Sequence, residues 1–191
     1  STAHMLGRRV AAHAHGTNGV NAALRAGVDS IEHGTFLDAA SLELFKKSGA
    51  WYVPTVIAGV SVGERAKLPG FYPPAAAEKA RRVGPQVQDA LRRAQAGGVR
   101  IAFGTDAGVF PHGENARELG YMVEAGLAPM DALRAATVGS AALLGIESET
   151  GTLEVGKQAD LIATRRNALV DVSELSRVIF VMRGGSIYKR E

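Results

Sequence analysis

A chain of 191 residues, 46% of them hydrophobic, is long enough to bury a substantial core in one large or two small domains, which excludes a disordered protein. The formal net charge is only +3, and the few aromatic residues do not alternate with the scattered basic pairs, which argues against nucleic-acid binding. The absence of cysteine excludes disulfide bonds, thiolate metal sites and a cysteine nucleophile. No apolar run approaches the ~20 residues that span a bilayer, so we expect no membrane partner.

The first residues are predicted to be the end of a helix. Ser1–Gly7 closes with a glycine, but no capping residue or periodic apolar residue opens it. We therefore expect the chain to start within a domain. No signal peptide is visible, which says little for a chain that starts within a domain. A cytoplasmic location is our expectation, and whether the whole protein is exported is left open.

Strands and helices are predicted to alternate after this segment. Thr17 or Asn18 is expected to cap the first helix, which ends at Gly27. Asp38 is expected to cap the second helix, which stops at Gly49. The strands expected around these helices are Arg9–Ala14, Ser30–Glu32 and Trp51–Val56. This order of elements indicates a parallel sheet of the α/β class.

The middle of the chain is predicted to interrupt this pattern. Ala58–Pro74 is rich in glycine and proline and lacks clean periodicity, so it is expected to be an irregular insertion over the functional face. The helical pattern of Ala75–Ala96 that follows is expected to break at Gly84-Pro85. The elements expected next are strand Arg100–Gly104, helix Ala116–Ala125, a helix with Pro129 as its first residue, and helix Gly139–Leu144, which ends at Gly145.

Short strands replace long helices near the end of the chain. They are expected at Gly151–Leu153, Ala159–Ala163, Val178–Arg183 and Ser186–Lys189. A hairpin turn at Gly184-Gly185 joins the last two. We therefore predict two domains, residues 1–146 and residues 147–191. The second is too short to be stable alone and is expected to need further strands.

Polar side chains follow three of the predicted strands. His13 lies in VAAHAHG and His33 in VDSIEHG, and Asp106 takes the corresponding position in VRIAFGTDAG. Ligands of parallel sheets bind beyond the carboxyl ends of the strands, so these side chains are expected to lie close together. Two histidines and a carboxylate suit a zinc ion and hydrolysis. His15 is on the same face as His13 if the strand continues. Three roles are open for it: a substrate contact, a metal ligand or a loop histidine.

Several sequence motifs together resemble a known family. They are HAHG, IEHG, FGTDAG with PHGEN behind it, APMDALRAATVGSAALLGI, and GTLEVGKQADLIA with VIFVMRGGSIYK. This set resembles the amidohydrolase superfamily over nearly the whole chain. Within it, the set is most similar to the metal-dependent prolidase branch, which is related to imidazolonepropionase.

The resemblance implies a barrel fold and a metal site. It implies the C-terminal half of a TIM-like (β/α)8 barrel, strands five to eight, over residues 1–146. Residues 147–191 would supply the C-terminal strands of a small β-sandwich. His13, His33 and Asp106 match the ligands of the fifth, sixth and eighth strands, for one or two zinc or other divalent ions. The family's first-strand His-x-His pair and fourth-strand lysine have no counterpart in these residues. We expect a homo-oligomer or pairing with an N-terminal half.

The function expected is hydrolysis of an amide bond, most simply that of a dipeptide as in Xaa-Pro dipeptidases, by metal-activated hydroxide. Asp106 would take the proton of the water and deliver it to the leaving nitrogen. The alternative for Asp106 is a cap or turn aspartate. His112 and Asn115, with His15, would contact the substrate, because barrel enzymes place such groups in the loops after the strands. The alternative is a surface loop in which Asn115 caps the next helix.

Two other functions remain open. One is the hydrolysis of a cyclic amide, as in imidazolonepropionase. The other is a non-catalytic metal-binding or assembly fragment. The substrate's side chains, the number of metals and the activity of this chain alone are not predicted.

Overall fold

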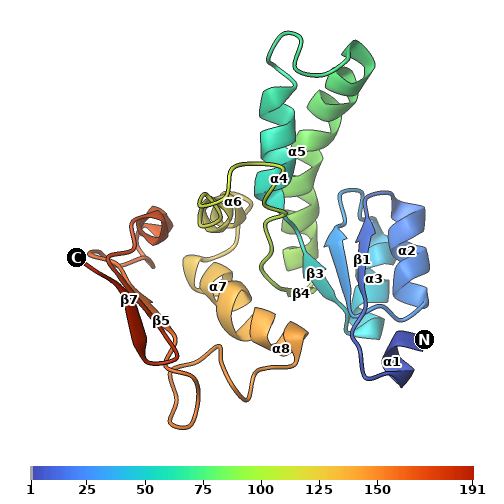
Figure 1. The fold of residues 1–191 in the computed structure, drawn as a ribbon. Helices are drawn as coiled ribbons and strands as arrows, with labels where there is room; N and C mark the ends of the chain where they lie inside the picture. Colours follow the sequence, from blue (N-terminus) through green and yellow to red (C-terminus); the bar gives the residue numbers. More distant parts are fainter. Residues whose placement is uncertain (1) are drawn as a thin grey trace.

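Four parallel strands form a single sheet in the first part of the molecule (Figure 1). The computed structural model describes residues 2–191. The strands lie in the order β1 (Ala11–Ala14), β2 (Ser30–His33), β3 (Trp51–Val53) and β4 (Arg100–Ile101). All three pairings are parallel, so the four carboxyl ends lie at the same edge of the sheet. The predicted α/β class and parallel sheet are thereby confirmed.

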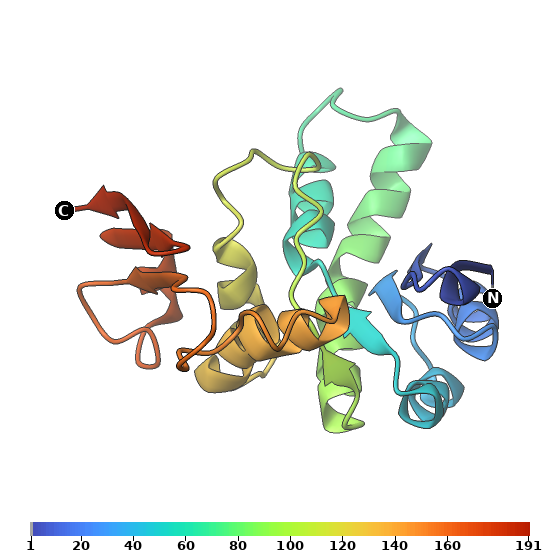
Figure 2. The same cartoon turned by 60° about the horizontal axis from the view of Figure 1, so that its bottom comes forward.

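Helices connect these strands. After α1 (Thr2–Met5), β1 and β2 are joined by α2 (Thr17–Arg25), and β2 and β3 by α3 (Ala39–Ser48). Between β3 and β4 lie two helices, α4 (Val56–Arg65) and α5 (Pro74–Ala96). These two pack side by side and project beyond the sheet, in the green part of the chain (Figures 1 and 2).

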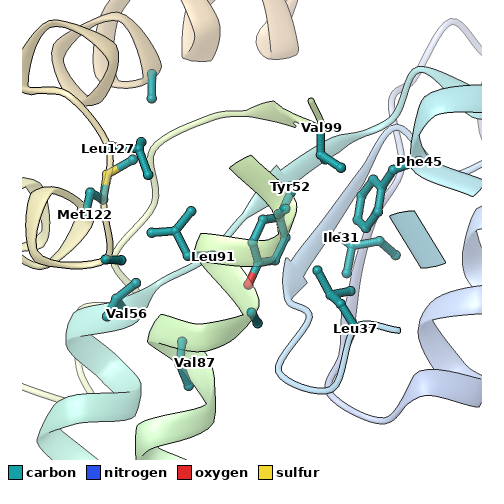
Figure 3. Close-up of a cluster of buried hydrophobic side chains, with 14 of the residues drawn as sticks. Ile31, Leu37, Phe45, Tyr52, Val56, Val87, Leu91, Val99, Met122 and Leu127 are labelled. Atoms are coloured by element: carbon teal, nitrogen blue, oxygen red, sulfur yellow. The ribbon is translucent and has the colours of Figure 1, made fainter. Parts of the chain in front are cut away.

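The main core lies between the sheet and its helices (Figure 3). Ile31 of β2 and Tyr52 of β3 have no exposed surface, and the ring of Phe45 from α3 packs edge-on against Tyr52 at 5.9 Å. Leu91 of α5 and Met122 of α6 (Arg117–Glu124) are equally buried. This burial fixes the strands relative to the helices, and with them the position of every strand end.

The irregular insertion predicted for Ala58–Pro74 is wrong over its first part, because α4 extends to Arg65. The break predicted at Gly84-Pro85 is also wrong, since α5 is continuous. A Cβ atom on Gly84 would lie 3.2 Å from the carbonyl oxygen of Gly59, so the glycine lets the two helices approach closely. Close packing of α4 on α5 thus outweighs the helix-breaking tendency of glycine and proline.

Helix ends follow the predictions at some positions. Asp38 caps α3 through a capping box with Ser41, and Gly49 ends the helix in the left-handed conformation, as predicted. The predicted cap at Thr17 or Asn18 is wrong, because Gly16 occupies the cap position of α2. The hydroxyl of Thr17 instead donates a hydrogen bond to the carbonyl of Phe36.

A loop of residues 102–116 follows β4, and most of residues 117–144 are helical. Residues 117–144 contain α6 (Arg117–Glu124), α7 (Pro129–Arg134), a π-helical turn (Ala135–Gly139) and α8 (Ser140–Leu144). Pro129 is the first residue of α7 and Gly145 ends α8 with φ 73°, as predicted. The π-helical turn joins α7 and α8 without a break.

An antiparallel sheet follows, drawn in orange and red in Figure 1. Its strands are β5 (Leu161–Ala163), β6 (Phe180–Arg183) and β7 (Ser186–Arg190), with a 3₁₀ helix at Val172–Ser176. The predicted hairpin is confirmed, because Gly184 and Gly185 have φ of 54° and 79° between β6 and β7.

The strand predicted at Gly151–Leu153 is wrong. Gly151 has φ 96°, and a Cβ there would lie 2.9 Å from that of Ala141, so this segment turns against α8. The division into domains at residue 146 stays a prediction. Within residues 2–191, no helix has both the length and the apolar composition needed to cross a bilayer.

Candidate functional site

Unusual backbone conformations mark the carboxyl edge of the parallel sheet. Within residues 2–191, the only residues other than glycine with positive φ are His33 (73°), Thr55 (49°) and Asp106 (54°). His33 ends β2, Thr55 lies two residues after β3, and Asp106 follows β4. A left-handed backbone is strained for such residues, by about 1–3 kcal/mol each, and such strain is concentrated at functional sites. Three successive strand ends are therefore held in conformations that these residues do not prefer.

Three histidines gather at this edge. His33 Nε2 lies 2.9 Å from His13 Nδ1, and the ring centroids of His15 lie 4.8 Å from His13 and 4.7 Å from His33. One nitrogen from each ring lies within 4.8 Å of the others. His33 is buried, whereas His13 and His15 are exposed. The expected proximity of His13 and His33 is present in the structure, and His15 joins them from the residue after β1.

Hydroxyl groups orient two of the three rings. Thr55 Oγ1 donates to the carbonyl of Pro54 at 2.8 Å and so accepts its bond from His33 Nδ1 at 2.7 Å. That arrangement places the proton of a neutral His33 on Nδ1 and leaves Nε2 with a lone pair. His15 Nδ1 lies 2.8 Å from Thr35 Oγ1. Fixing one ring nitrogen so that the other is free is how proteins prepare histidine ligands.

The local electrostatics favour neutral rings. Burial, followed by the neighbouring His15 and His13, lowers the pKa of His33 to about 4. Burial also lowers the pKa of His15, with smaller contributions from His13 and Lys79. Asp106 acts in the opposite direction on both residues. Neutral imidazole is the form that binds a metal ion, so this donor set fits a divalent cation.

These groups open into one pocket of about 700 Å³. Part of the lining comes from the strand ends and the residues after them: the three histidines, Thr35, Thr55 and Asp106. Side chains of α4 and α5 form an apolar wall. Lys79 of α5, and Tyr72 from the segment between α4 and α5, add polar groups to the lining. Asp106 is exposed and lies on a turn, where its carbonyl accepts from Val109. The pocket thus combines three histidines, a carboxylate, one ammonium group and an apolar surface.

The other two predicted substrate residues lie outside this group. His112 is exposed in the loop before α6 and does not line the pocket. Asn115 donates through Nδ2 to Thr105 Oγ1 at 2.9 Å and accepts at Oδ1 from the Gly113 amide. Asn115 therefore braces the residue before Asp106 and does not cap α6, whose cap position is held by Ala116.

Thr35 and Lys79 are polar lining residues that the sequence analysis did not predict. Thr35 lies two residues after His33, so the strand-end argument applied to histidine could have included it. Lys79 is spaced by four and eight residues from Val83 and Val87, which places all three on one face of α5. The sequence analysis did not connect this face with the pocket, because α4, which packs against α5, was predicted to be irregular.

Comparison with known proteins identifies relatives of similar sequence. Ochratoxinase from Aspergillus niger is 35% identical in an alignment that is 191 residues long. This alignment covers 95% of this chain and 38% of the relative. A segment of 37 residues is 57% identical to imidazolonepropionase of Symbiobacterium thermophilum, covering 19% of this chain and 9% of the relative.

Solved structures of other proteins share the fold of this chain. The crystal structure of a Xaa-Pro dipeptidase with bound methionine in the active site superposes with a TM-score of 0.95 at 48% identity. The match covers 98% of this chain and 46% of that one, so the chain spans less than half the length of these relatives. The model of the amidohydrolase family matches residues 1–188. With three histidines that could hold a metal ion at the ends of parallel strands and a family match over nearly its whole length, this chain belongs to the amidohydrolase family.

Proposed function

We propose that the protein carrying this chain is a metal-dependent hydrolase that cleaves the amide bond of a small substrate, most simply a dipeptide of the Xaa-Pro kind. The observation that carries the proposal is the convergence of His13, His15, His33 and Asp106 on one pocket at the carboxyl edge of a parallel sheet. The likeness to a Xaa-Pro dipeptidase and to ochratoxinase supports the same chemistry.

His13 and His33 would hold the metal, with Asp106 as a third ligand. Zinc is the ion best suited to two imidazoles and a carboxylate. Such an ion supplies Lewis-acid activation of water and of the substrate carbonyl. One nitrogen of His15 lies within 4.8 Å of a nitrogen of each of the other two rings. His15 would therefore either complete the metal site or contact the substrate. The bond between His33 and Thr55 supports a ring already oriented for binding.

Asp106 would move the proton. Its carboxylate lines the pocket beside the histidines and is exposed, so it can accept a proton from water and release it to a leaving nitrogen. Proton transfer by a positioned side chain contributes about 10²–10⁴-fold to the rate.

The rest of the pocket suits a substrate with one carboxylate and one apolar group. The ammonium group of Lys79 would pair with the carboxylate. The wall that includes Val62, Val83 and Val87 would cover the apolar group. His112 and Asn115 would contribute to substrate binding only if their loop moves toward the pocket.

We also propose that β1 to β4 are strands five to eight of a (β/α)8 barrel and that residues 147–191 belong to a separate small β-sandwich. In residues 2–191 the outer edges of β1 and β4 have no strand beside them. Open edges of this kind favour pairing with further strands, from a longer form of the chain or from another copy.

Activity on a panel of dipeptides tests the proposed function. We would assay the natural protein that carries this chain on Xaa-Pro dipeptides, other dipeptides and cyclic amides, before and after chelation and zinc addition. Zinc-dependent cleavage of dipeptides is the expected result. Zinc-dependent opening of cyclic amides alone would replace the substrate class, and absence of turnover with every substrate would contradict hydrolysis.

A further inference from the structure

Glu118 of α6 has a fully buried side chain that does not itself line the pocket. It has no exposed surface, and it lies 62 residues along the chain from its contact at Val56. Its Oε1 accepts a hydrogen bond from the Val56 amide at 2.9 Å, and its Oε2 accepts one from the Ile57 amide at 2.6 Å. Burial of a carboxylate is costly, so an arrangement of this kind needs a compensating role.

The two amides begin α4. The first amides of any helix lack partners inside the helix, and a side chain at the cap position usually supplies one. Thr55 occupies that position in α4 but makes no side-chain cap bond. Its hydroxyl is already used, because it donates to Pro54 and accepts from His33 Nδ1. The carboxylate of Glu118 therefore replaces the missing cap, and its charge also suits the helix N-terminus.

Thr55 depends on a fixed start of α4. Its backbone has φ 49° and ψ 48°, a left-handed conformation that is strained for a β-branched residue. The residue relaxes unless the chain on both sides is held. Val56 and Ile57 are fully buried and bound to Glu118, so they hold the side that leads into the helix. Relaxation of Thr55 would carry its hydroxyl away from the His33 ring.

We propose that Glu118 is a positioning residue of the candidate site, which through α4 and Thr55 fixes the orientation and tautomer of His33. The proposal rests on the role of His33 as a metal ligand given above. The chain of contacts runs from Glu118 to the Val56 and Ile57 amides, then through Thr55 to His33 Nδ1. Outer contacts of this type change metal affinity by about 10–100-fold when they are removed.

The test compares Glu118→Gln with Thr55→Val in the natural protein that carries this chain. Glu124→Gln is the matched control, because Glu124 lies on the same helix and is exposed. The first readout is the imidazole ¹H–¹⁵N spectrum of the metal-free chain, which reports the tautomer of His33. The second is the affinity for zinc, measured by titration on samples that circular dichroism shows to be folded.

In Glu118→Gln we expect the His33 Nδ1–H signal to move or broaden and zinc affinity to fall about tenfold or more. In the control, both should equal the wild type. Because Glu118 acts through Thr55, adding Glu118→Gln to Thr55→Val should change the affinity little further. If Glu118→Gln fails to fold, Glu118→Asp, which keeps a carboxylate, must show the same displacement of the His33 signal.

Two results would overturn the proposal. One is a Glu118 variant with a lower Tm whose His33 tautomer and zinc affinity equal the wild type, which would indicate a stabilising role only. The other is full additivity of the two substitutions. If the wild-type chain binds no zinc, the proposed function fails, but the histidine spectra still decide whether Glu118 positions the ring.

Discussion

The two sheets of this chain differ in what they bury and in what lies at their strand ends. Strands β2 and β3 are covered by helices, and their ends carry His33 and Thr55 in strained conformations. In the antiparallel sheet β7 is exposed along its whole length, and the turn between β6 and β7 is made of glycines that adopt positive φ without strain. Strain is thus found where a rigid core can hold it. We therefore expect substitutions at the parallel sheet to have the larger effects.

The largest expected effect comes from the carboxylate of the pocket. Asp106→Asn removes a proton acceptor without changing side-chain size, so turnover of the natural protein should fall by about 10²–10⁴-fold while its zinc content stays nearly constant. Asp171→Asn is the control from the C-terminal region, where asparagine can still cap the 3₁₀ helix. Equal turnover in the two variants would contradict the proposal that Asp106 transfers the proton.

A matched pair of isoleucines compares the two cores. Ile31 of β2 is fully buried, whereas Ile187 of β7 is 52% exposed. Ile31→Ala should lower the free energy of unfolding by about 2–5 kcal/mol, because it leaves a cavity. Ile187→Ala should change it by less than about 0.5 kcal/mol. Urea denaturation measures both, and comparable losses would show that the C-terminal sheet is packed as tightly as the first.

The stability of the chain should depend on pH through Glu118. Burial raises the pKa of Glu118 to about 7, against the lowering effect of its two amide bonds. The native state then binds more protons than the unfolded state between pH 4.5 and 7, so stability falls as the pH rises through this range. The expected loss is about 3 kcal/mol, and Glu118→Gln should flatten the curve. An unchanged curve in the variant would assign the pH dependence to other groups.

The smallest effect is expected from a pair of tyrosines. The hydroxyl of Tyr52 donates to the carbonyl of His33 at 2.9 Å in the buried core, whereas Tyr188 is 72% exposed. Tyr52→Phe should cost about 1 kcal/mol, because the carbonyl loses its partner. Tyr188→Phe should be neutral. Thermal denaturation compares the stability of the two variants. A Tyr52→Phe variant as stable as the wild type would mean that the hydrogen bond to the His33 carbonyl does not stabilise the fold.

The sequence predicted well what depends on local patterns. The alternation of strands and helices as far as β3, the Asp38 cap and the glycine hairpin follow from spacing and residue type, and these are confirmed. The gathering of His13 and His33 also followed, since every strand of a parallel sheet points the same way. His15 joined them for the same reason, although its role as ligand or substrate contact stays a prediction.

What the sequence could not predict depends on packing between distant segments. Helix α4 was missed because its glycines are poor helix formers in isolation, and close contact with α5 explains them. A Cβ on Gly59 would lie 2.5 Å from Val87, and one on Gly63 would lie 3.7 Å from Gly84. The pairing of Glu118 with the start of α4 joins residues 62 apart and leaves no periodic signal. The loop that carries His112 and Asn115 showed a recognisable motif, but the direction of its side chains depends on contacts such as Asn115 with Thr105.

The central claim is that the carboxyl edge of the parallel sheet holds a divalent metal ion through its histidines. The most direct measurement is the zinc content, per chain, of the natural protein and of its His13→Ala/His33→Ala double variant, by elemental analysis. We predict at least one zinc ion per chain in the wild type and its loss from the folded double variant. Zinc absent from the wild type, or retained at the same stoichiometry in the double variant, would contradict the assignment.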